Sequence, residues 1–251
     1  MNDTVKRDNR KFLPRFLLIV AAAGILGGLA GFFGSMAADY GVLAAARSGL
    51  KGLMTTIAPW AIPACTAALL IPGFCLYRKA RKGYAAWDQE SDEDYQAIED
   101  KLNYCMLLCT LTLLADFLFL AVGSAFRASG MILNALCFLV SIGLILLLQQ
   151  RVVDLTRRMN PEKKGSIYDV NFQKKWLDSC DELERAQIGQ AAFHAYKVLN
   201  TVCPILWAVL LLLHYIAGTG LLPILVVIVI WGALQVSYMR ACIRLGRRSS
   251  R

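Results

Sequence analysis

Long hydrophobic stretches alternate with polar segments along the whole chain. A bilayer core of roughly 30 Å requires about 20 helical residues, and the uncharged stretches at residues 130–149 and 221–239 meet that length. The pattern predicts an all-α fold, a polytopic membrane helix bundle that forms a single membrane domain over residues 1–251. The six predicted transmembrane helices cover residues 13–38, 54–77, 104–126, 130–149, 198–216 and 221–239.

Basic residues are distributed unequally among the segments that join these helices. Of the 27 Lys and Arg residues, 24 fall in the N-terminal segment (counting Arg15 at the start of the first helix), the loops 78–103 and 150–197, and the C-terminal tail. An excess of Lys and Arg is typical of cytoplasmic segments. We therefore predict that both chain ends and both long loops are cytoplasmic. The net charge of +9 comes from residues at helix ends that meet lipid head groups, so we expect the lipid bilayer and not a nucleic acid as the partner of this charge.

The loop 78–103 contains an acidic run at residues 88–94. Ser91 and Asp94 have the spacing of a capping box, and acidic side chains are favoured in the first turn of a helix because of the helix dipole. We predict a helix that begins there and continues through Leu102 into the third transmembrane helix.

The loop 150–197 is the largest segment outside the predicted membrane helices. After a polar turn at residues 160–165, apolar residues recur at helical spacing, which predicts an amphipathic helix from about Asp169 or Asn171. An apolar face left in water would cost about 25 cal/mol per Å². We expect the first half of this helix to rest on the inner leaflet and the second half on a protein surface. The interaction candidates are Phe172, Trp176, Cys180 and Leu183.

Asp116 is the one charged residue deep within a predicted transmembrane helix. A carboxylate at that depth is costly and normally faces the bundle interior or a water-filled cavity. It is either a proton or cation site, or a hydrogen-bonded group that holds helices together. Residues that we expect on its helix face or near its depth are Thr112, Thr66, Ser141 and Trp231, with His214 about one turn nearer the outside.

Glycines line one face of the first predicted helix. Small residues allow another helix to approach closely within lipid, which indicates helix packing inside the chain or an oligomer contact. The packing candidates are Gly24, Gly27, Gly28 and Gly31.

The sequence contains no phosphate-binding glycine loop, no HExxH and no GxSxG. The eight cysteines lie within predicted helices or on the cytoplasmic side and include no CxxC, so they are expected to act as small apolar residues. We expect no catalytic residues, no metal and no cofactor.

Three segments of the large loop carry a family resemblance: NPEKKGSIYD at residues 160–169, FQKKWLDSCDE at 172–182 and AYK at 195–197. They resemble a bacterial family of membrane proteins known as domain-of-unknown-function family 3169. The similarity is sharp over residues 160–207 and rests on hydropathy elsewhere. It implies a multi-pass protein of a bacterial cell membrane, from a Gram-positive lineage, and brings no known activity or site residues.

Two functional hypotheses remain open. The first is a non-enzymatic membrane protein that acts in regulation by binding a cytosolic or membrane protein partner through its cytoplasmic loops. The second is a permease subunit or small secondary transporter that uses Asp116 in the bundle interior. A membrane enzyme ranks below both, because no nucleophile–base pair or metal-ligand set is visible.

Overall fold

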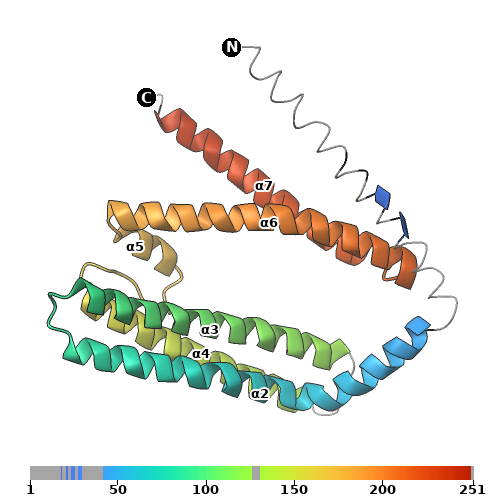
Figure 1. The fold of residues 1–251 in the computed structure, drawn as a ribbon, viewed down its shortest axis with the longest axis horizontal. Helices are drawn as coiled ribbons and strands as arrows, with labels where there is room; N and C mark the ends of the chain where they lie inside the picture. Colours follow the sequence, from blue (N-terminus) through green and yellow to red (C-terminus); the bar gives the residue numbers. More distant parts are fainter. Residues whose placement is uncertain are drawn as a thin grey trace. The chain divides into compact units, whose positions relative to one another are not determined.

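The computed structural model describes residues 42–125 and 131–249, together with residues 18, 21, 24, 25, 28 and 29. Every regular element in these residues is a helix, which confirms the all-α prediction. The helices are α2 (Val42–Ala86), α3 (Asp92–Ala125), α4 (Met131–Met159), α5 (Phe172–Asp178), α6 (Glu182–Ala217) and α7 (Leu222–Ser249) (Figure 1).

Five of these helices are long and apolar enough to cross a membrane, by length and composition. They overlap the predicted second to sixth transmembrane helices, and their candidate spans are Trp60–Ala86, Asp92–Ser124, Ile132–Met159, Glu182–Ala217 and Leu222–Leu245. The predicted first helix, residues 13–38, lies mostly outside the described residues. The chain is thus of the multi-pass membrane type, while the count of six and the orientation stay predictions.

Contacts within the chain gather into two compact units. We call Ser48–Gln187 the central unit, and Met1–Arg47 with Ile188–Arg251 the terminal unit. The central unit contains α3, α4, α5 and most of α2, whereas the terminal unit contains α7 and most of α6. The expected single membrane domain over the whole chain stays a prediction.

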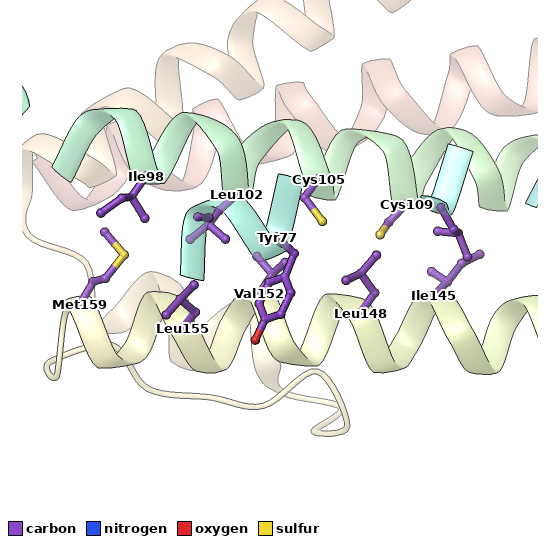
Figure 2. Packing of buried hydrophobic residues seen from close by; sticks show 12 residues of the cluster. Tyr77, Ile98, Leu102, Cys105, Cys109, Ile145, Leu148, Val152, Leu155 and Met159 are labelled. Atoms are coloured by element: carbon purple, nitrogen blue, oxygen red, sulfur yellow. The ribbon is translucent and has the colours of Figure 1, made fainter. Parts of the chain in front are cut away.

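The core of the central unit lies between α2, α3 and α4 (Figure 2). Its buried side chains recur every three or four residues along α3 and α4 and at three- and seven-residue intervals along α2, which is the spacing of helices that pack by coiled-coil geometry. They are Leu70, Tyr77 and Ala80 of α2, Ile98, Leu102, Cys105 and Cys109 of α3, and Ile145, Leu148, Val152, Leu155 and Met159 of α4. Gly73 of α2 also faces this core, where a Cβ would make an ordinary van der Waals contact with Leu148 Cδ2 at 3.6 Å.

The start of α3 confirms the predicted helix. The Asp94 amide donates to Ser91 Oγ at 3.3 Å, so Ser91 caps the helix as expected. Asp88 Oδ1 accepts from the amides of Glu90 and Ser91, both at 3.0 Å, and these bonds lower the pKa of the Asp88 carboxyl. From Asp92 the helix then continues without interruption into the membrane-spanning stretch.

The predicted amphipathic helix is shorter than expected, which corrects that prediction. α5 ends at Asp178, and α6 begins at Glu182. The break comes from a second capping box: the Glu184 amide donates to Asp181 Oδ1 at 2.7 Å, and the Asp181 amide donates to Glu184 Oε2 at 3.1 Å. Arg185 also caps the end of α5 by donating to the carbonyls of Leu177 and Asp178. Local capping therefore outweighs the apolar periodicity that extends across the break.

Candidate functional site

Asp116 lies in the interface of α2, α3 and α4 and is fully buried. The Ser141 hydroxyl of α4 donates to Asp116 Oδ2. The Thr66 hydroxyl of α2 lies 3.4 Å from Asp116 Oδ1 and 3.0 Å from Ser141 Oγ. One polar cluster thus joins three helices and brings together Asp116, Thr66 and Ser141, for which the sequence predicted a similar height.

Two threonine hydroxyls of this cluster donate to the backbone of their own helices, the first being that of Thr66, which donates to Ile62 O at 2.8 Å. The Thr112 hydroxyl, one turn along α3, donates to Leu108 O at 2.8 Å and so does not bond to Asp116. Because both carboxyl oxygens of Asp116 face hydroxyl groups and neither is exposed, the cluster can hold the three helices in register. These contacts are compatible with the structural role of Asp116, and its role as a proton or cation site stays a prediction.

The other two intramembrane candidates, Trp231 and His214, belong to the terminal unit. Trp231 Nε1 donates to Asn200 Oδ1 at 3.1 Å, and Gln235 Nε2 donates to the same oxygen. His214 Nδ1 has no hydrogen-bond partner among the described residues. Because Asp116 lies in the central unit, its predicted grouping with Trp231 and His214 stays a prediction.

A buried lysine, which the sequence analysis did not single out, organises the loop between α4 and α6. The side chain of Lys163 is only 7% exposed and forms an ion pair with Glu184. Its Nζ atom lies 3.3 Å from Cys180 Sγ and 5.8 Å from the centroid of the Trp176 ring. Glu184 itself is 34% exposed, so the pair lies at the edge of the folded loop. The lysine thus links the turn after α4 to α5 and to the start of α6.

Hydrogen bonds attach this loop to the helices beside it. Asn160 Nδ2 donates to the Tyr95 hydroxyl of α3 at 2.6 Å. Gln150 Oε1 of α4 accepts from the Ser166 hydroxyl at 3.1 Å and from the Ile167 amide at 3.0 Å. Residues 160–185, which we call the folded loop, are therefore a structured part of the central unit.

Gly165 occupies a position of the folded loop whose backbone conformation and close neighbours favour glycine. Its φ angle of +126° lies in a region that residues with a side chain rarely adopt. A Cβ atom there would also lie 2.9 Å from Cδ2 of Phe172. The turn at residues 160–165 therefore depends on glycine at its last position.

The four interaction candidates of the loop differ in their exposure. Phe172 and Trp176 are half-buried with ring centroids 5.5 Å apart, and Cys180 is buried. Leu183 is 69% exposed. Three of the four thus contribute to the interior of the folded loop, whereas Leu183 is available at its surface. Their role in binding stays a prediction. The other large apolar side chains exposed on this loop are Tyr168, Val170 and Leu177.

Charged contacts in the folded loop shift two pKa values. Burial acts to lower the pKa of Lys163, but the hydrogen bonds and charges of Glu184 and Cys180 outweigh it and raise the pKa above its ordinary value. The ion pair with Lys175 and a bond from the Asn171 amide lower the pKa of Asp169. Both shifts favour the charged forms that hold the loop together.

The glycine candidates fall in the least described part of the chain. Gly24 and Gly28 are helical and exposed, and no described atom would contact a Cβ at either position. Gly27 and Gly31 lie outside the described residues. The expected helix packing at this face stays a prediction. No group of three or more metal-binding side chains occurs within the described part of the chain.

The family model described as "Protein of unknown function (DUF3169)" matches residues 8–242, nearly the whole chain. The chain belongs to the DUF3169 family. The resemblance that the sequence indicated through the large loop is thus confirmed and extends well beyond that loop. Searches of curated proteins and of solved structures found no match. Membership in DUF3169 brings no activity or site residue, so the functional argument depends on the geometry described above.

Proposed function

We propose that this chain is a non-enzymatic multi-pass membrane protein that binds a protein partner through its folded loop. The observation that carries the proposal is the combination of an ordered interior with an apolar surface. Lys163 and Glu184 hold the loop together, while Val170 is fully exposed and Leu183 is 69% exposed. A structured loop that exposes several large apolar side chains can supply the apolar centre of a protein–protein contact.

The charges around Leu177 and Leu183 favour a protein over a lipid surface as the partner. The exposed acidic residues Asp178, Asp181 and Glu182 lie next to Leu177 and Leu183 in the sequence. Anionic lipids attract basic segments and repel acidic ones. A protein surface with an apolar centre and basic residues at its rim would match this side of the loop. By the predicted topology the loop is cytoplasmic, which makes a cytosolic protein or the cytosolic part of a membrane protein the expected partner.

The surroundings of Asp116 support this proposal over the transporter alternative. A transported proton or cation requires a path of water or polar groups to the carboxylate. Asp116 is fully buried, and the Ser141 hydroxyl donates to its carboxylate. A structural cluster of this kind suits a protein whose helices anchor and position a loop.

The proposal is tested by adding charge to the exposed apolar positions. Val170→Asp and Leu183→Asp should each reduce the amount of partner recovered after chemical cross-linking in intact membranes. The matched controls, Gln173→Asp and Gln187→Asp, add the same charge at exposed polar positions of the same region and should recover the partner normally. Protease resistance of the loop should be unchanged in all four variants. Equal recovery by the two sets of variants would overturn the proposal.

A further inference from the structure

An apolar groove lies along the side of the central unit between α2 and α4. Its volume is about 650 Å³, within the roughly 300–1,000 Å³ typical of ligand pockets. α2 contributes its wall from Pro63 to Phe74, and α4 contributes from Leu136 to Arg151. At 1.5 Å per residue the α4 wall is about 22 Å long, which exceeds the ~15 Å thickness of one leaflet of the hydrocarbon core.

The groove ends at a guanidinium group. Arg151 is the one charged residue that lines it, and the same arginine lines a second pocket of about 390 Å³ nearer the ends of the helices. That second pocket also contains Arg81 of α2 and Arg158 of α4, with Asp154 as its only acidic residue. The apolar groove therefore leads directly into a basic site.

The basic site has positive charge that the protein does not neutralise. Among the described residues, none of the three arginines forms an ion pair. The carboxylate of Asp154 accepts a hydrogen bond from Gln150 Nε2 at 2.8 Å. Tyr77 and Tyr84 line the same pocket, and tyrosine is enriched at the level of lipid head groups. A guanidinium group binds phosphate oxygens through two parallel hydrogen bonds, so three exposed arginines suit a phosphate ligand.

We propose that this composite site binds one anionic phospholipid, with an acyl chain in the groove and its phosphate group at Arg81, Arg151 and Arg158. Free phosphate would occupy only the basic site and leave the groove unused. A helix of another protein packed in the groove would not require three arginines without ion pairs. A zwitterionic lipid carries its own cation, which the arginines repel. By the predicted topology the site opens to the inner leaflet, where anionic lipids are abundant. This site lies apart from the folded loop, and the inference does not depend on the proposed partner.

The full-length chain, purified in detergent and stripped of lipid, should be titrated with phosphatidylglycerol or phosphatidylcholine and the bound lipid counted by native mass spectrometry. Phosphatidylglycerol should bind at least about fivefold more tightly. Each basic residue near a lipid surface contributes about 1 kcal/mol, so Arg81→Gln and Arg151→Gln should each weaken phosphatidylglycerol binding about fivefold. Arg157→Gln, an exposed position of α4 outside both pockets, is the control and should bind normally. Inorganic phosphate in large excess should not displace the lipid.

The acyl-chain site is tested by filling the groove. Val140 and Leu139 are neighbours on α4 and both are 63% exposed, but only Val140 lines the groove. Val140→Trp should weaken binding of the lipid, whereas Leu139→Trp should not. If Val140→Trp does not fold, a phosphatidylglycerol with a photoreactive group in its acyl chain should label Leu144 and Leu147 in the unaltered chain. Equal affinity for both lipids, an equal effect of Arg157→Gln and Arg151→Gln, or no label in the groove would overturn the proposal.

Discussion

Replacement of Lys163 by Met should open the folded loop while leaving the membrane helices intact. Methionine is an unbranched side chain that fills irregular space well, so the substitution removes the ammonium group with little loss of volume. The lost interactions are the ion pair with Glu184, the bond to Cys180 Sγ and the contact with the Trp176 ring. The result isolates the contribution of one buried charge to the order of the loop.

The expected magnitude follows from the burial of the two partners. A hydrogen bond to a charged group contributes about 1.5–3 kcal/mol, and breaking a fully buried pair costs about 3–5 kcal/mol. Glu184 is 34% exposed, so water can solvate it after the loss of Lys163, and the lower range applies. A loss of about 2 kcal/mol raises the opening equilibrium of the loop roughly thirtyfold.

Amide hydrogen exchange in detergent or nanodiscs measures this opening directly. In Lys163→Met, the amides of Ser179, Cys180 and Glu184 should exchange roughly thirtyfold faster, because they are bonded inside the folded loop. The control is Lys164→Met, which removes an exposed neighbouring lysine with no ion pair among the described residues. Exchange in α3 and α4 should not change. Unaltered exchange of the loop in Lys163→Met would show that the buried lysine does not hold the loop together.

Three further predictions follow from the same contacts. Gly165→Ala should destabilise the loop by about 1–3 kcal/mol because residue 165 has a positive φ, and limited proteolysis of the loop should become faster. The control Gly189→Ala, at a position of α6 where a Cβ would meet no other described atom, should leave proteolysis unchanged. Equal proteolysis of the two variants would contradict this prediction. Asp116→Asn keeps the shape of the side chain, so the melting temperature in detergent should change by less than about 4 °C and partner binding should persist; a stable variant that loses all activity would favour the transporter alternative. The folded-state pKa of Lys163 is raised above 10.5, so its contribution to stability is present below that value and is lost as pH rises through the folded-state pKa. The fluorescence of Trp176, taken as the difference between the unaltered chain and Trp176→Phe, should therefore stay constant from neutral pH to about 10.5. A transition at lower pH would contradict the ion pair.

The sequence predicted what depends on local patterns. Ser91 and Asp94 indicated the start of α3, because a capping box acts over three residues. Depth counting indicated that Thr66 and Ser141 lie near Asp116, because the length of a membrane helix fixes the height of each residue. These relations require only helical geometry and no knowledge of how the helices pack.

The folded loop shows what the sequence did not predict. Lys163 contacts Glu184 at a sequence separation of 21 residues, with α5 between them, and no periodic pattern relates the two. The Asp181–Glu184 capping box was readable, but the apolar repeat from Phe172 to Leu183 hid it and led to one helix being predicted in place of two. The composite lipid site likewise depends on which faces of α2 and α4 lie together, which neither helix specifies alone.

Photo-crosslinking from single positions of the loop in intact membranes tests the central claim most directly. A photoreactive amino acid at Val170 or Leu183, which are exposed, should form a covalent adduct with a partner protein. The same amino acid at Phe172, which is half-buried and packs against Trp176, should yield mainly links within the chain. Adducts with lipid alone from Val170 and Leu183, or no adduct from either position, would contradict the account of the folded loop as a surface that binds a protein.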